Sequence, residues 1–106
     1  VAGEQLSLAL KLAEQAVAER PVAAYLDTLG WVQFRRGQLP AARAALESAL
    51  ARGPEPEISA HLGEVLWVQG EHDRAIAIWR EGLTGAATED AATLRATARR
   101  VAGRDL

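Results

Sequence analysis

Two histidines are the side chains in this sequence whose chemistry suits a general acid or base near neutral pH. His61 lies one helical turn from both Glu57 and Glu64, a spacing at which an imidazole and two carboxylates can ligate a metal ion. His72 stands between two acidic residues, a setting typical of the start of a helix. Charges one turn apart are also common on solvated helices, and no third histidine is present. The pattern therefore favours an ordinary surface helix over a metal site.

Cysteine and the catalytic motifs that a sequence can show are missing here. Cysteine is absent, which removes disulfides, thiolate nucleophiles and zinc–thiolate sites together. The sequence contains no phosphate-binding loop, no Gly-x-Ser-x-Gly and no His-Glu-x-x-His. We therefore expect no catalytic residue, no metal and no cofactor, and we predict that the chain is not an enzyme.

The charge and the apolar runs of the sequence argue against two classes of partner, nucleic acids and the membrane interior. The net charge is −2, so no overall positive field attracts nucleic acid. Hydrophobic residues make up 49% of the chain, but charged or polar residues interrupt every apolar run well before the ~20 residues that span a bilayer. We expect neither a nucleic-acid partner nor direct insertion into a membrane.

The sequence repeats itself with a shift of 33 residues, because Leu29-Gly30 recurs as Leu62-Gly63. The same shift relates Gly37 to Gly70, Ala42 to Ala75, Leu46 to Trp79, and, toward the N-terminus, Ala49 to Ala16 and Pro54 to Pro21. So many coincidences at one period indicate a true internal repeat.

Each unit shows the apolar spacing of two helices. The pattern predicts one repeat over 22–54, with helices at 22–36 and 39–52, and another over 56–85, with helices at 57–69 and 73–83. The segment 4–20 corresponds to the second helix of a truncated unit, and 88–102 forms a last helix that Thr88 caps. We thus expect an all-α chain of about six helices with antiparallel neighbours. The arginines of the last segment, Arg95, Arg99, Arg100 and Arg104, predict a solvated capping helix rather than a basic contact strip.

Small residues are expected where the two helices of a unit approach each other. Gly30 and Ala42 are predicted to face one another, because a larger side chain there would push the helix axes apart. The large residues Leu29, Leu46, Leu62 and Trp79 are predicted to fill the remaining space, and Ala49 and Gly82 are predicted to contact the next unit. A Gly30→Leu substitution should therefore be severely destabilising.

At these positions the sequence resembles the tetratricopeptide repeat. The residues that match the family's pattern are Leu26, Leu29, Gly30, Phe34, Ala42, Leu46, Ala49 and Pro54 in the first copy and Leu62, Gly63, Trp67, Ala75 and Trp79 in the second. The resemblance covers residues 4–85 and implies a right-handed superhelical solenoid of antiparallel helix pairs, built as a single repeat domain over residues 1–106. The period of 33 departs from the family's usual ~34 residues, and Ala87 stands where a closing proline is expected.

The resemblance also implies a concave groove lined by the first helix of each unit. The groove residues that it implies are Asp27, Trp31, Phe34, Arg35, His61, Glu64 and Trp67. Phe34 and Trp67 are alternatively half-buried spacers between helices, and for Trp31 a contact role and a packing role both stay open. The family's clamp for the carboxylate of a chaperone tail is not expected, because Asp27, Trp31 and His61 occupy its places.

We predict from this resemblance a protein–protein interaction module or scaffold that binds a peptide or partner surface in the groove. The alternative is a structural segment that packs against the rest of a longer protein or against itself. The apolar face of the first helix lacks its partner, so we expect homodimer contacts through residues 4–19. The absence of methionine suggests an excised piece, and the similarity to C-terminal repeats of bacterial tetratricopeptide proteins suggests the cytoplasm, the periplasm or the cell envelope.

Overall fold

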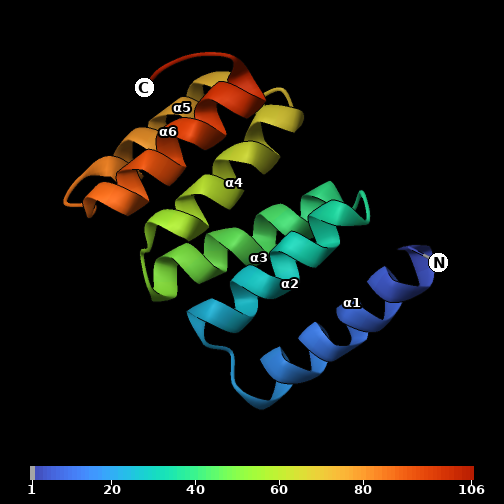
Figure 1. Cartoon of the computed structure of the whole chain (residues 1–106). Helices are drawn as coiled ribbons and strands as arrows, with labels where there is room; N and C mark the ends of the chain where they lie inside the picture. The colour runs from blue at the N-terminus through green and yellow to red at the C-terminus, as the bar shows by residue number, and fades with distance from the viewer. Residues whose placement is uncertain (1) are drawn as a thin grey trace. The chain divides into compact units, whose positions relative to one another are not determined.

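The computed structural model describes residues 2–106, with side chains from residue 3 onward, and its regular elements are all α-helices (Figure 1). They are α1 (Ala2–Glu19), α2 (Ala23–Arg35), α3 (Leu39–Arg52), α4 (Pro56–Val68), α5 (His72–Leu83) and α6 (Thr88–Ala102). This described part thus has six helices and no strand, which confirms the predicted fold class. Each helix begins and ends within two residues of its predicted bounds.

The helices form two compact units, which divide between Gly53 and Pro54. In the first unit α2 packs against both α1 and α3. In the second unit α4 packs against both α5 and α6, and α5 and α6 also contact each other (Figure 1). The prediction of one repeat domain over 1–106 stays a prediction, and each unit is described by itself below.

The two helical hairpins, α2–α3 and α4–α5, turn in the same way. Gly37 and Gly70 have φ angles of 78° and 87°, in the left-handed region that favours glycine. The N–H of Gly37 donates to the carbonyl of Phe34, and the next N–H, of Gln38, donates to the carbonyl of Gln33. This pair of bonds satisfies the last carbonyls of α2, and the same pattern recurs after α4. The repeated glycines of the sequence therefore mark the hairpin turns.

The glycine of each Leu-Gly pair lies where two helices come closest. A Cβ added to Gly30 would lie 2.7 Å from Cγ of Leu46 and 3.2 Å from the carbonyl oxygen of Ala42. A Cβ added to Gly63 would overlap the indole of Trp79. The predicted close approach of Gly30 and Ala42 is confirmed, and no side chain larger than hydrogen fits at position 63 without movement of Trp79.

Helix α4 of the second unit buries more of its side chains than helix α2 of the first unit does. In α4 the side chains of Ile58, Leu62, Val65 and Leu66 are buried, because α5 and α6 lie against it and also contact each other. In α2 only Leu26 and Gly30 are buried. Leu46, Leu62 and Trp79 fill the cores as predicted, whereas Leu29 is only half-buried.

The start and the packing of α6 differ in part from the prediction. Thr88 is the first helical residue and does not cap the helix, because the N-cap position is taken by Ala87 and no side chain caps it. Leu94 and Ala98 are fully buried. A Cβ added to Gly82 of α5 would lie 2.8 Å from Cβ of Ser59 in α4 and 3.1 Å from Cδ1 of Leu94. Gly82 was predicted to contact the next unit; it does lie against α6, which follows its repeat, but its nearest neighbour is Ser59 of α4 in its own repeat.

Candidate functional site

Four of the predicted groove residues lie on α2, which the α2–α3 hairpin holds in place. Asp27, Trp31 and Arg35 follow one another at steps of four residues, and Phe34 lies three residues after Trp31, so the four share one side of the helix. The rings of Trp31 and Phe34 are stacked, with centroids 5.2 Å apart and planes at 30°. Both rings are half-buried and Arg35 is exposed. The structure therefore brings an aromatic pair and charged side chains together on one helix.

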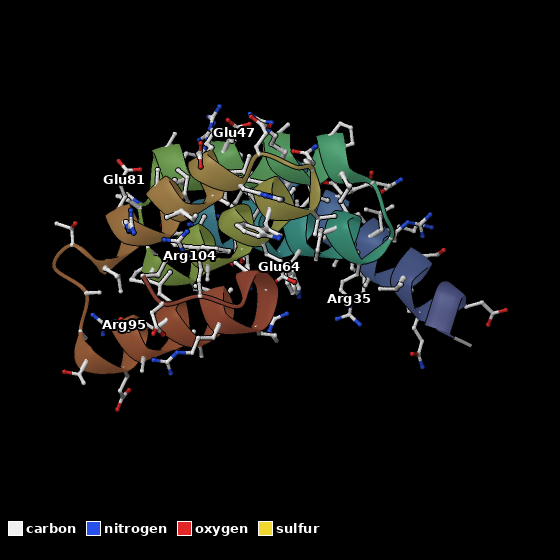
Figure 2. The ribbon with its side chains drawn as sticks, turned by 90° about the horizontal axis from the view of Figure 1, so that it is seen from above. Arg35, Glu47, Glu64, Glu81, Arg95 and Arg104 are labelled. Carbon is white, nitrogen blue, oxygen red and sulfur yellow. The ribbon has the colours of Figure 1, made fainter. Side chains whose placement is uncertain are left out.

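Glu64, which the resemblance places at the equivalent of Trp31, has a different environment from the predicted groove. Its side chain is only 12% exposed, and it projects from α4 toward α6 (Figure 2). Arg100 of α6 donates two hydrogen bonds to the Glu64 carboxylate, of 2.8 Å from Nη2 to Oε1 and 3.2 Å from Nη1 to Oε2. Such bidentate pairing is the strong form of a salt bridge. Glu64 is thus part of the contact between α4 and α6 rather than an open binding position.

The same pair corrects the prediction that the α6 arginines are simply a solvated face. The hydrogen bonds to Glu64 raise the pKa of Arg100 above its ordinary value; burial acts in the opposite direction but is the weaker effect, and the negative charge of the carboxylate adds a still smaller increase. The Arg100 guanidinium therefore stays charged over the whole working pH range. By contrast, Arg99 pairs with Asp105 at 2.6 Å on an exposed surface.

Trp67 lies in a ring cluster of the second unit. It stacks on His72, with centroids 3.8 Å apart and planes at 13°, and its centroid lies 6.2 Å from that of Trp79. Trp79 is fully buried, and its Nε1–H donates a hydrogen bond of 3.2 Å to the carbonyl of Ala60. Sequence reasoning predicted the core position of Trp79 but missed the His72 contact. The available signal was the short turn after α4, which returns the start of α5 to the last turn of α4.

The acidic and histidine side chains of residues 3–106 are not arranged as a metal centre. Among the described residues, no three side chains of histidine, cysteine, aspartate and glutamate are grouped so that they could hold a metal ion. Glu64 is turned toward Arg100, while Glu57 is exposed and His61 is half-buried. None of the helices in residues 2–106 is long and apolar enough to cross a membrane.

Comparison with known proteins agrees with this architecture. The profile of the tetratricopeptide repeat family matches residues 28–92, which is more than half of the chain. A TPR repeat-containing protein of Pseudomonas aeruginosa is 49% identical over 41 residues, which are 39% of this chain and 7% of that relative. The matched segment is thus a small part of a much longer protein. With its helix pairs, its turn glycines and its Leu-Gly contacts, the chain belongs to the tetratricopeptide repeat family.

Proposed function

We propose that this chain is a protein-interaction module whose α2 side binds a peptide or partner surface through Trp31, Phe34 and Arg35. Tetratricopeptide repeats are generally protein–protein interaction modules and are typically not enzymes. The observation that carries the proposal is the stacked pair of Trp31 and Phe34, which leaves part of both rings at the surface. Tryptophan and arginine are the residues that most often dominate binding energy at protein interfaces.

The chemistry of this side of α2 suits a partner with both apolar and polar groups. Aromatic rings supply a large apolar contact at low cost in side-chain entropy. Arg35 and Asp27 lie at either end of the ring pair and carry opposite charges. The partner that fits is an extended or helical peptide with an apolar side chain between an acidic group and a basic group.

We expect the remaining predicted groove residues to contribute less to partner binding. Glu64 is held by Arg100, and Trp67 is in contact with His72. His61 is half-buried on α4. We therefore expect the loss of Trp67 to act through the stability of the second unit, and the loss of Trp31 to act through binding.

A peptide library displayed on phage and panned against the immobilised chain tests the proposal. Peptides that bind the wild-type chain are then measured against Trp31→Ala and Tyr25→Ala. Tyr25 is the matched control because it is an exposed aromatic on the same helix and lies on the side that faces α1. We expect Trp31→Ala to weaken the selected peptides at least about tenfold, as for a residue that dominates an interface. Melting curves of both variants check that they are folded.

Two outcomes would contradict the proposal. Peptides that bind Trp31→Ala as tightly as the wild type would remove the role of the α2 ring pair. Loss of binding that follows Tyr25→Ala instead would place the peptide site on the α1 side of α2.

A further inference from the structure

The second unit has a charged pocket between α5 and the residues that follow α6. Its volume is about 300 Å³, and it is lined by Asp73, Ile76, Ala77, Arg80 and Arg104. The first four lie at helical spacing on one side of α5. Ile76 is largely buried and forms the apolar floor, whereas the other four are exposed. The pocket therefore combines two guanidinium groups, one carboxylate and a small apolar floor.

Arg104 reaches this pocket because the chain turns sharply after α6. Gly103 has a φ angle of 67°, in the left-handed region, and its N–H donates a hydrogen bond of 3.0 Å to the carbonyl of Arg99. Asp105 is paired with the side chain of Arg99 at 2.6 Å. The segment after α6 therefore runs back beside α5 (Figure 1), where Arg104 lines the pocket.

The positive charge of the pocket is not neutralised within the described residues 2–106. Arg80 has no acidic residue three or four positions away on α5, and the neighbour of Arg104, Asp105, is already paired with Arg99. Neither pocket arginine forms an ion pair with a carboxylate of the described part of the chain. Two arginines and one aspartate give the pocket a net charge of +1.

The equivalent positions of α3 carry charges that neutralise each other. With the 33-residue shift, Ile76 and Arg80 correspond to Arg43 and Glu47. Nε of Arg43 lies 3.2 Å from Oε1 of Glu47, one helical turn away. In α5 an apolar residue replaces the base and an arginine replaces the acid. The uncompensated charge is therefore particular to α5 and is not shared by the two hairpins.

The same side of α3 is also exposed. Asp73 and Ala77 correspond to Pro40 and Ala44, and both of these are exposed although a second hairpin follows α3 in the sequence. Exposure of this side of the second helix therefore does not depend on whether another hairpin follows. A partner from outside the chain can reach it.

We propose that the α5 pocket binds a carboxylate side chain on an amphipathic helix of a partner protein, with Arg80 and Arg104 as the groups that hold it. Guanidinium groups pair with carboxylates through parallel hydrogen bonds, and one carboxylate balances the net charge of the pocket. A phosphate dianion would exceed that charge and face Asp73. A second copy of the chain would bring the same net positive charge to the contact.

The shape of the site favours a helix over a free small molecule. Most of its lining is exposed, so a small ligand would keep much of its surface in water. Asp73 and Arg80 are seven residues apart, which is about 10 Å along the helix, and the small Ala77 between them lets a second helix approach. An antiparallel partner helix can therefore place a base beside Asp73 and an acid between the arginines.

Two synthetic peptides test the proposal, each held helical by a covalent bridge on its far face because short helices are marginal in water. One carries lysine, two leucines and glutamate at the first, fourth, fifth and eighth positions of two turns, and the other has glutamine in place of glutamate. Titration of the isotope-labelled 1–106 chain, followed by NMR of its amides, gives the dissociation constants. We expect the glutamate peptide to bind at least about tenfold more tightly and to shift the signals of 73–80 and 104.

Arg80→Glu should abolish binding of the glutamate peptide, and a peptide with lysine in place of glutamate should bind this variant but not the wild type. Arg104→Gln should also weaken the glutamate peptide. Arg95→Glu is the control, with the same change of charge at an exposed arginine of α6 that does not line the pocket. It should change the affinity by less than about twofold. Circular dichroism checks that the variants are folded.

The proposal is overturned if neither peptide binds, if glutamate and glutamine peptides bind equally, or if Arg95→Glu weakens binding as much as Arg80→Glu. Displacement of the peptide by an equal concentration of inorganic phosphate would also overturn it, since the pocket would then prefer a dianion. This site does not depend on the ring pair of α2. Weakening of the glutamate peptide by Trp31→Ala would therefore place that peptide on α2 and overturn the assignment to α5.

Discussion

Gly63 and Trp79 form a pair in which each residue requires the other. The indole lies against the backbone of α4, where its N–H is satisfied by the carbonyl of Ala60 and its ring excludes a side chain at position 63. In the first unit a Cβ on Gly30 would approach Leu46 less closely than a Cβ on Gly63 approaches the indole, so the overlap to be relieved is smaller. The glycines of the two Leu-Gly pairs thus both allow two helices to approach closely, but position 30 tolerates an added side chain better than position 63 does.

We predict that Gly63→Ala is more damaging than Gly30→Ala. The free energy of unfolding should fall by about 3 kcal/mol for Gly63→Ala and by about 1–2 kcal/mol for Gly30→Ala, because overpacking costs more against a rigid ring. Urea denaturation followed by circular dichroism measures both values. Gly3→Ala is the control, since a Cβ there meets no atom within 4 Å and alanine favours the exposed helix α1. Equal losses at positions 30 and 63 would contradict the role assigned to Trp79.

At the scale of the helices, α6 is held to α4 by apolar packing and by one charged pair. Leu94 and Ala98 supply the buried apolar face of α6. The carboxylate of Glu64 is largely removed from water, while Arg100 remains 61% exposed. Removal of Arg100 would leave this carboxylate with poor solvation and without its two donors, which is more costly than loss of a surface pair.

We predict that Arg100→Ala lowers the free energy of unfolding by about 1 kcal/mol, a value reduced by the exposure of the guanidinium. Arg99→Ala, one residue away and paired with Asp105 at the surface, should change it by less than about 0.5 kcal/mol. Thermal denaturation of both variants measures the difference. In a Glu64→Leu background Arg100→Ala should lose its effect, and an unchanged effect there would show that Arg100 acts through another contact.

The whole molecule consists of two compact units that divide at Gly53 and Pro54. Each unit has its own contact glycine and its own buried large residue, Leu46 in the first and Trp79 in the second. In repeat proteins the free energy is the sum of the stabilities of the units and of the contacts between neighbours. Local defects should therefore affect mainly the unit in which they lie.

We predict that Gly30→Ala lowers hydrogen-exchange protection of α2 and α3 and leaves that of α4 to α6 nearly unchanged. Gly63→Ala should give the opposite distribution, because each substitution disturbs one core. Exchange followed by mass spectrometry of peptic fragments separates the two units. A uniform loss of protection in either variant would show that the chain opens as one cooperative body.

The apolar spacing within each unit, together with the 33-residue shift, was sufficient to predict the helices, the turn glycines and the approach of Gly30 to Ala42. These features depend on residues close in sequence or on a spacing repeated within the chain. The partner of Glu64 was not predictable in this way, because Arg100 lies 36 residues further on, in a helix that lacks the Leu-Gly pair. The stacking of Trp67 on His72 was missed because a histidine between two acidic residues indicates the polar start of a helix rather than a contact with an aromatic ring.

The three tryptophans of the chain are divided between the two units, with Trp31 in the first and Trp67 and Trp79 in the second. Trp79 is fully buried, while Trp31 and Trp67 are half-buried, so their emission reports different environments. Subtracting the fluorescence of Trp31→Phe from that of the wild type isolates the emission of the first unit. The chain therefore carries an intrinsic optical signal for each half, with which ligand binding and unfolding can be followed without a label.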